Sequence, residues 1–226
     1  MSDISCGFVG LGAMGRPMAL NLHRAGCLSA VFNRSPEKAA TLAEETGVAA
    51  VVELGDLAKR VNAVVLCVPA DDDVLAAVET LAASLAPGSF VLDCSTVAAA
   101  TAEAAAARLA SEDIGFLDCP VSGGTEGARA GTLSIMVGGE AALVERARPL
   151  LEAMGKSVVH LGPAGAGQAA KATNQVMVAG INQAVTEALA FGEAHGLPMT
   201  DLIRCLSGGA AGNWFLDHRG ATMVRG

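Results

Sequence analysis

The feature that most constrains this chain is a glycine-rich turn, Gly10-Leu11-Gly12-Ala13-Met14-Gly15, with the spacing G-x-G-x-x-G. It follows the apolar run Ile4–Val9 directly and opens a helical pattern that Gly26 can end, after which the apolar run Leu28–Phe32 begins. This order predicts a strand–helix–strand unit, whose three glycines allow a tight turn, close approach of a ligand and close helix packing. We therefore expect the loop to bind the pyrophosphate of a dinucleotide at the helix N-terminus. A glycine turn without a ligand is the alternative.

The same alternation of short apolar runs and helical stretches continues as far as residue 162. Further strands are expected at Ala49–Val52, Ala63–Val68, Phe90–Leu92, Gly115–Asp118, Leu133–Val137 and Val158–Leu161. Further helices are expected from Pro36 to just before Gly47, from Asp71 towards Leu85, near Ala99–Ala110 and near Ala141–Met154. Apolar strands that alternate with helices predict an α/β Rossmann fold, a doubly wound parallel sheet with helices on both faces.

The pattern changes at Gly162-Pro163, after which no strand is expected. The remaining sequence predicts a long helix from about Gln168 to Glu193 and shorter helices near Thr200–Leu206 and Asn213–Val224. We therefore divide the chain into a dinucleotide-binding domain, residues 1–163, and an all-helical domain, residues 164–226. The helical part is too small to bury so long a helix alone, so it needs a partner chain or residues that this sequence lacks.

Composition argues against several classes of partner. The 226 residues carry a net charge of −8 without a basic block, and only 3% are aromatic. These values disfavour nucleic acid or an anionic membrane surface. The chain shows neither a signal peptide nor a membrane-spanning run, so we expect a cytoplasmic protein. The six cysteines and four histidines lack metal-ligand spacing, so the cysteines are expected to be small buried hydrophobes and no metal is expected. The acidic run Asp71-Asp72-Asp73 is attributed to a helix N-terminus rather than to a metal site.

The end of the second strand indicates which cofactor is bound. NAD sites usually place an Asp or Glu there for the ribose 2′-hydroxyl, whereas this chain has Asn33-Arg34-Ser35. Arg34 can pair with a 2′-phosphate, Ser35 can donate to it, and Lys38 adds positive charge. We therefore predict NADP as the preferred cofactor over NAD. The alternative is that Arg34 is an ordinary surface arginine and selectivity is lax.

Three more loops leave the expected carboxyl ends of strands, where open α/β sheets place their ligands. Two of them are Cys67-Val68-Pro69 and Cys94-Ser95-Thr96. The third runs from Asp118 to Gly124, and in it Ser122 precedes the bare backbone of Gly123 and Gly124. This third loop is a suitable cradle for a small carboxylate, with an ordinary loop as the alternative.

A lysine on the long helix is the candidate for proton transfer. Lys171, Asn174 and Gln175 have i, i+3 and i+4 spacing, so they share one helix face, which is otherwise apolar. A lysine on an apolar face is costly to bury unless it pairs or takes part in chemistry. The alternative is a lysine that extends to solvent.

Together these motifs resemble the β-hydroxyacid dehydrogenase family, whose members include 3-hydroxyisobutyrate dehydrogenase and tartronate semialdehyde reductase. The resemblance covers the whole chain and rests on four segments in order: Gly7–Ala19 with Asn21-Leu22, Asp118–Gly124, Gly131–Gly139 and the Lys171 helix. It implies an oxidoreductase that transfers a hydride between NADP(H) and a small 3-hydroxy acid or its semialdehyde, with Lys171 as general acid and base. Tartronate semialdehyde, succinic semialdehyde or glyoxylate reduction on the same scaffold and a non-catalytic dinucleotide-binding module are the alternatives. Imine reduction is disfavoured, because relatives with that activity usually replace the lysine.

The resemblance also implies roles for individual residues. Ser122, Gly123 and Asn174 would hold the substrate, and Thr96 would lie by the nicotinamide. Gln175 is a further candidate contact, and Trp214 falls where relatives place a bulky residue near the substrate, with core packing as its alternative. The helical domain of the family continues past Gly226, so we expect part of it to be absent from this chain. A homodimer or homotetramer through the helical domain is expected.

Overall fold

The computed structural model describes residues 4–225, which divide into two compact units between Lys171 and Ala172. The first unit contains the strands β1 (Cys6–Val9), β2 (Leu28–Phe32), β3 (Ala49–Ala50), β4 (Ala63–Leu66), β5 (Phe90–Asp93), β6 (Gly115–Asp118), β7 (Val121–Ser122), β8 (Leu133–Gly139) and β9 (Gly155–Gly162). Its helices are α1 (Gly15–Arg24), α2 (Pro36–Thr46), α3 (Leu54–Ala58), α4 (Asp71–Ala82), α5 (Ala99–Ala110), α6 (Gly124–Ala130) and α7 (Ala141–Met154).

The strands form one sheet in the order β3-β2-β1-β4-β5-β6-β8-β7, with β9 beside β8. From β3 to β6 all neighbours are parallel, which is the strand order of a Rossmann fold. The register aligns the last residues of neighbouring strands, with Val9 opposite Leu66, Leu66 opposite Asp93, and Asp93 opposite Asp118. The loops that follow these strands therefore leave the same edge of the sheet. This confirms the predicted α/β fold.

At its far side the sheet also contains antiparallel pairs. Strand β8 runs antiparallel to β6 and to β7, so the sheet is mixed. The physical reason is the connection from Ser122 to Leu133, in which the short helix α6 turns the chain back instead of making the long crossover that a parallel strand would need. Val121 and Ser122, expected in a loop, pair with Ile135 and Ser134 as a short strand. Sequence periodicity also gave no sign of the short helices α3 and α6.

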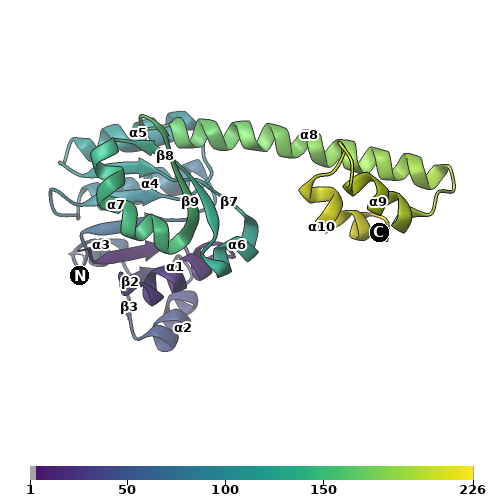
Figure 1. The fold of residues 1–226 in the computed structure, drawn as a ribbon. Coiled ribbons are helices and arrows are strands. Elements are labelled where there is room, and N and C mark those ends of the chain that lie inside the picture. The colour runs from purple at the N-terminus through teal and green to yellow at the C-terminus, as the bar shows by residue number, and fades with distance from the viewer. Residues whose placement is uncertain (1–3, 226) are drawn as a thin grey trace. The chain divides into compact units, whose positions relative to one another are not determined.

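Helices cover both faces of the sheet in the first unit (Figure 1), and an apolar layer lies between the sheet and each set of helices. Side chains of α1, α2, α6 and α7 pack on one face of the sheet around Phe8 and Leu92, which are fully buried. Side chains of α3, α4 and α5 pack on the other face around Val64 and Leu109. Each fully buried aliphatic or aromatic side chain contributes about 1.5–3 kcal/mol, so both faces stabilise the sheet strongly.

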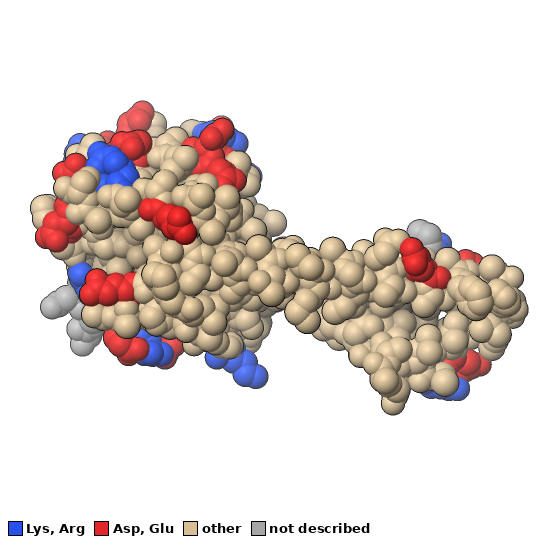
Figure 2. All heavy atoms as spheres, turned by 90° about the horizontal axis from the view of Figure 1, so that it is seen from above, with Lys and Arg blue, Asp and Glu red and all other residues tan. Residues whose placement is uncertain are grey.

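The second unit is helical, as predicted. It holds most of α8 (Ala166–Ala194), together with α9 (Met199–Ser207) and α10 (Trp214–Met223). Its buried apolar side chains are Val185, Leu189 and Leu216. No charged residue occurs from Ala172 to Thr186, and this part of the surface carries neither red nor blue in Figure 2.

The cysteines differ in burial. Cys6, Cys27, Cys94 and Cys119 are buried, but Cys205 is exposed on α9, so its expected burial is wrong. Helical spacing alone did not show whether Cys205 lies on the buried or the exposed face of this amphipathic helix.

Within residues 4–225 no three His, Cys, Asp or Glu side chains gather as a metal site would require. In the same range, no helix is both long and apolar enough to cross a membrane.

Candidate active site

The glycine loop joins β1 to α1, and its three glycines meet different surroundings. Gly10 has a φ of +95°, and a Cβ there would overlap the carbonyl oxygen of Cys67. A Cβ at Gly15 would overlap the carbonyl oxygen of Gly10, whereas a Cβ at Gly12 would meet nothing within 4 Å. Protein packing therefore explains Gly10 and Gly15 but leaves Gly12 unexplained. Open space beside the first N–H groups of a helix fits the pyrophosphate of a dinucleotide, so the residues present suit this cofactor.

The loop is held in place from the end of β2. The side-chain oxygen of Asn33 accepts a hydrogen bond from the main-chain N–H of Leu11 at 2.7 Å, and its amide nitrogen donates to the carbonyl oxygen of Ser35 at 3.0 Å. Asn33 thus braces the glycine loop. The Arg34 side chain is 83% exposed and forms an ion pair with Asp73 on α4 at 3.1 Å. Ser35 and Lys38 lie exposed at the start of α2, close in sequence to Arg34.

The loops after β4 and β5 are joined to each other. The main-chain N–H of Val68 donates to the hydroxyl oxygen of Ser95 at 3.0 Å. Cys67 is in contact with the glycine loop through the close approach of Gly10, whereas Pro69 and Thr96 are exposed. The structure therefore brings the glycine loop and the loops bearing Val68 and Thr96 together at one edge of the sheet, as the sequence predicted for a cofactor site.

Lys171 ends the first unit, and its side chain reaches β7. Its Nζ donates a hydrogen bond to the carbonyl oxygen of Val121 at 2.8 Å, directly beside Ser122. Partial burial lowers the pKa of Lys171 from its usual value. Gly123 has a φ of +130°, and a Cβ at Gly124 would meet nothing within 4 Å. A half-buried amine thus lies next to a stretch of open backbone, an arrangement suited to proton transfer beside a bound carboxylate.

Two buried carboxylates at this edge were not singled out from the sequence. Asp118 is fully buried, and its two oxygens accept hydrogen bonds from the main-chain N–H groups of Gly165 at 2.8 Å and Gln168 at 2.9 Å. Asp93 lies opposite Asp118 on β5, and its Oδ2 is buried without a hydrogen-bond partner among the described residues. Burial raises the pKa of Asp93 to about 6, against hydrogen bonds from Ser95 that lower it. An acid ending an apolar strand, as in Phe116-Leu117-Asp118, is the signal that could have revealed this pair.

The remaining predicted site residues belong to the second unit. Asn174 is partly buried and donates a hydrogen bond to Gln175 at 3.0 Å, and Gln175 is exposed. Trp214 begins α10, is 50% exposed and stacks on His218 with ring centroids 4.7 Å apart. Their roles as substrate contacts stay predictions.

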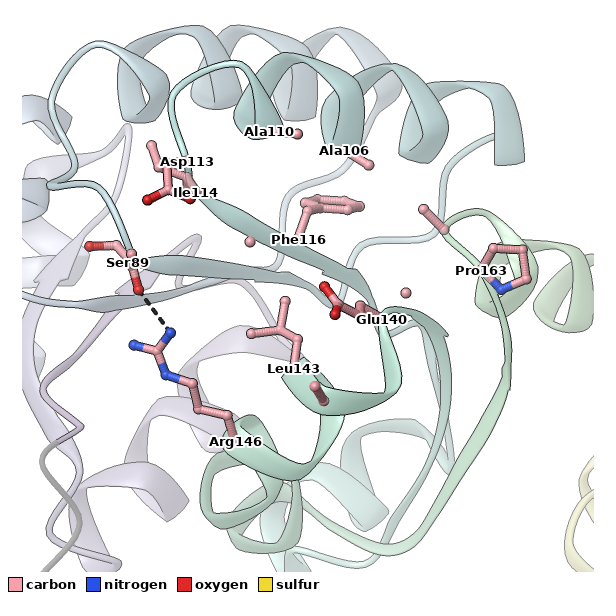
Figure 3. Close-up of a pocket in the computed structure, with 15 residues that line it drawn as sticks. Ser89, Ala106, Ala110, Asp113, Ile114, Phe116, Glu140, Leu143, Arg146 and Pro163 are labelled. Carbon is pink, nitrogen blue, oxygen red and sulfur yellow. Dashed lines mark hydrogen bonds between the residues drawn. The ribbon is translucent and has the colours of Figure 1, made fainter.

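Among the cavities of the first unit, two differ clearly in size and lining. The smaller, about 450 Å³, opens beside Gly12 and Ala13 and is lined by Arg16, Arg24 and Arg129. The larger, about 680 Å³, lies between α5 and α7 and contains none of the predicted site residues (Figure 3). Its one arginine, Arg146, donates to the carbonyl oxygen of Gly88 at 2.8 Å and lies over the Phe90 ring. That guanidinium has a structural role, so size alone does not identify the functional cavity.

Known proteins share this architecture over the whole chain. Residues 5–162 match the family described as the NAD binding domain of 6-phosphogluconate dehydrogenase, and residues 165–226 match that described as NAD-binding of NADP-dependent 3-hydroxyisobutyrate dehydrogenase. An NAD-dependent L-serine dehydrogenase of Pseudomonas aeruginosa is 41% identical over 93% of this chain and 71% of its own length. The chain belongs to the β-hydroxyacid dehydrogenase family.

Two further similarities support this membership. A 3-hydroxyisobutyrate dehydrogenase of Pseudomonas aeruginosa is 40% identical over 96% of this chain and 73% of its own length. The solved structure of Mycobacterium tuberculosis 3-hydroxyisobutyrate dehydrogenase with L-serine superposes with a TM-score of 0.88, at 35% identity, over 96% of this chain and 74% of the other. The chain is accordingly an NAD(P)-binding dehydrogenase that acts on hydroxyl groups.

Proposed function

We propose that this dehydrogenase transfers a hydride between NADP(H) and a small 3-hydroxy acid or its semialdehyde, with Lys171 as general acid and base. The observation that carries the proposal is the position of the Lys171 amine, which is half-buried and lies against β7 beside Ser122. The Val121 carbonyl that accepts from this amine follows β6, and the last residues of β6, β5, β4 and β1 lie in register, so the glycine loop after β1 leaves the same edge of the sheet.

The nicotinamide cofactor, when bound, accepts or supplies the hydride. In the oxidation direction, neutral Lys171 takes the proton of the substrate hydroxyl as the C–H hydride leaves, and a carbonyl forms. In reduction, protonated Lys171 gives that proton back to the oxygen. A pKa lowered by burial favours the neutral amine that oxidation requires. The hydrogen bond to the carbonyl oxygen of Val121 orients the amine in either state.

The substrate class follows from the surroundings of the amine. Ser122, Gly123 and Gly124 supply a hydroxyl and accessible backbone for a carboxylate at a short distance from the reacting oxygen. L-serine and 3-hydroxyisobutyrate, named in similar proteins, both carry a hydroxyl on the carbon β to a carboxylate. We therefore place 3-hydroxy acids first, with tartronate semialdehyde, succinic semialdehyde and glyoxylate as further substrates to screen.

A substitution of Lys171 tests the mechanism. Lys171→Met keeps the length of the side chain and removes the proton carrier, so kcat should fall by about 10²-fold or more. The affinity for NADPH, measured by fluorescence titration, should not change. Lys156→Met, an exposed position on β9, is the matched control and should keep full activity. Retained turnover in Lys171→Met would remove this residue from the mechanism.

The preference for NADP rests on Arg34. Its guanidinium is 83% exposed and held by Asp73, an ion pair that a ribose 2′-phosphate can replace. Arg34→Leu should lower kcat/KM for NADPH by about 10-fold or more while leaving the value for NADH within about 2-fold, since removing a charge-assisted contact costs 1.5–3 kcal/mol. Arg60→Leu, at another exposed arginine, is the control. An unmodified protein that turns over NADH faster than NADPH would overturn the preference.

For the helical unit we propose pairing with a second copy of this chain. Val176 and Met177 are 75% and 62% exposed on the part of α8 that carries no charge. An uncharged apolar strip is complementary to itself, as a two-fold interface requires. Sedimentation analysis should therefore show at least a dimer.

A further inference from the structure

One amide side chain joins the loop after β5 to the start of α8. Gln168 is 2% exposed, and its Nε2 donates a hydrogen bond to the carbonyl oxygen of Ser95 at 2.9 Å. Its Oε1 accepts from the main-chain N–H of Val97 at 3.2 Å. Thr96 lies between these two residues. Both ends of the Gln168 amide are therefore bonded to the backbone on either side of the residue expected to lie by the nicotinamide.

The main chain of Gln168 is anchored independently of its side chain. Its N–H donates to Oδ2 of Asp118, while the N–H of Gly165 donates to Oδ1 of the same carboxylate. A carboxylate at a helix N-terminus is stabilised by the N–H groups and the dipole of the helix. A Cβ at Gly167 would lie 2.7 Å from the carbonyl oxygen of Asp118, so the first turn of α8 packs directly on β6. The start of α8 is thus rigidly attached to the sheet.

Lys171 follows Gln168 by three residues, so it lies about one helical turn further along α8. Its Nζ is bonded to the carbonyl oxygen of Val121. On the other side, the Ser95 hydroxyl accepts from Val68 in the loop after β4. A chain of hydrogen bonds thus runs from the β4 loop through the Thr96 loop to Gln168, and from there along α8 to the amine.

We propose that Gln168 is a positioning residue, which sets the distance between the Thr96 loop and the Lys171 amine. Resting on the proposed function, this assigns Gln168 the task of keeping the hydride-transferring ring of the cofactor in register with the proton-transferring group. A misplacement of about 1 Å between reacting groups can cost about 10²-fold in rate. Gln168 is suited to the task, since its two amide ends bond the Thr96 loop while its main chain is bonded to Asp118.

The test compares three variants of the whole chain. Gln168→Met keeps the side-chain length and removes both hydrogen bonds to the Thr96 loop. Gln183→Met is the matched control, because Gln183 is exposed on the same helix. Leu109→Ala, in the buried layer under α5, lowers stability without touching this network. Each variant is assayed at a temperature well below its own unfolding midpoint.

The expected result is a split between kinetic parameters. Gln168→Met should lower kcat by about 10- to 100-fold with the KM of the hydroxy acid changed less than about 3-fold. Amide hydrogen exchange at Val97, whose acceptor is lost, should become faster in this variant only. Gln183→Met and Leu109→Ala should keep kcat. A Gln168→Met protein with wild-type kcat, or a Leu109→Ala protein with the same loss of kcat, would overturn the proposal.

Two further readouts separate failure of this inference from failure of the proposed function. If the unmodified protein turns over none of the screened substrates, the proposed function fails, and the positioning role is then judged on NADPH binding and amide exchange. Gln168→Met should still weaken NADPH binding and speed exchange at Val97. Unchanged values of both would overturn the positioning role even then.

Discussion

The two units of this chain cover their apolar surface to very different degrees. In the sheet unit both faces of the sheet are packed by helices, and side chains such as Phe8, Leu92 and Leu109 are completely buried. In the helical unit only Val185, Leu189 and Leu216 are buried within the described residues, while Val176, Met177, Phe191 and Trp214 stay at least half exposed. The helical unit thus leaves more of its apolar surface exposed than the sheet unit, whose most exposed large apolar side chains are Val52, Val159 and Leu161.

The difference extends to polar groups. At the carboxyl edge of the sheet, both carboxylate oxygens of buried Asp118 accept hydrogen bonds, and both ends of the buried Gln168 amide form them. In the helical unit the polar side chains Asn174 and Gln175 bond to each other near the surface. The residues at the carboxyl edge are thus held by hydrogen bonds to distant parts of the first unit, whereas the bond between Asn174 and Gln175 joins neighbours in the sequence.

The largest effect is expected from truncating one leucine in each unit. Leu92→Ala in the sheet core should lower the free energy of unfolding by about 3–5 kcal/mol, because the close-packed layer cannot fill the cavity. Leu189→Ala in the helical unit should cost about 2 kcal/mol or less, because its smaller cluster can relax. In urea unfolding, the fluorescence of Trp214, the only tryptophan, follows the helical unit, and circular dichroism follows the helices of both units. Equal losses of unfolding free energy in Leu92→Ala and Leu189→Ala would contradict the difference in packing between the two units.

A smaller effect is expected from the buried carboxyl of Asp93. Its pKa of about 6 in the fold exceeds the usual value of 3.8 for an aspartate, so the folded protein holds this proton more tightly than the unfolded chain does. Below pH 3.8 the carboxyl costs no stability; the cost grows as the pH rises to about 6 and is complete above that. Asp93→Asn should therefore be more stable than the unmodified protein at pH 8, by at most about 3 kcal/mol, and lose this advantage near pH 4.

Asp71 provides a control of opposite sign. Hydrogen bonds from Thr101 and from the N–H of Ala98 lower the pKa of Asp71, so its charge stabilises the fold above pH 3.8 and the effect is lost as the pH falls through the lowered pKa. Asp71→Asn should reduce stability at neutral pH and match the unmodified protein in strong acid. Unfolding curves of both variants from strong acid, about pH 2, to pH 8 check the two signs. If the stability differences of Asp93→Asn and Asp71→Asn from the unmodified protein changed with pH in the same direction, the two opposite pKa shifts would be refuted.

The smallest effect on stability is expected on the uncharged stretch of α8. Val176→Asp should change the free energy of unfolding of the helical unit by less than about 0.5 kcal/mol, because the side chain is 75% exposed. Its effect should appear in association instead, as a lower sedimentation coefficient. Val52→Asp, 74% exposed on the sheet unit, is the matched control and should leave association unchanged. A strong loss of stability in Val176→Asp with unchanged association would contradict the proposed pairing.

Local sequence signals predicted much of the fold. The apolar run Leu28–Phe32 and the helix from Pro36 to just before Gly47 were correctly bounded. A Pro at the first helical position and a Gly with φ of +77° mark the two ends of the helix. The antiparallel return of β8 was not predicted, because strand direction depends on which partner is available and not on periodicity. The candidate site was predicted through Gly12 and Lys171, whose residue types are unusual for their surroundings. Gln168 and Asp118 received no role, because a single amide or acid carries no periodic signal.

The sequence by itself determined the elements that chemistry requires: a glycine turn before a helix, a Ser-Gly-Gly stretch and a lysine on an apolar helix face. These features are local in the sequence, since the backbone freedom at Gly12 and the helical spacing around Lys171 depend on a few neighbouring residues. Only the tertiary structure decided how they are held together. Hydrogen bonds between residues far apart in the chain, such as Gln168 to Ser95 and Gly165 to Asp118, depend on the strand register, which exists only in the folded sheet.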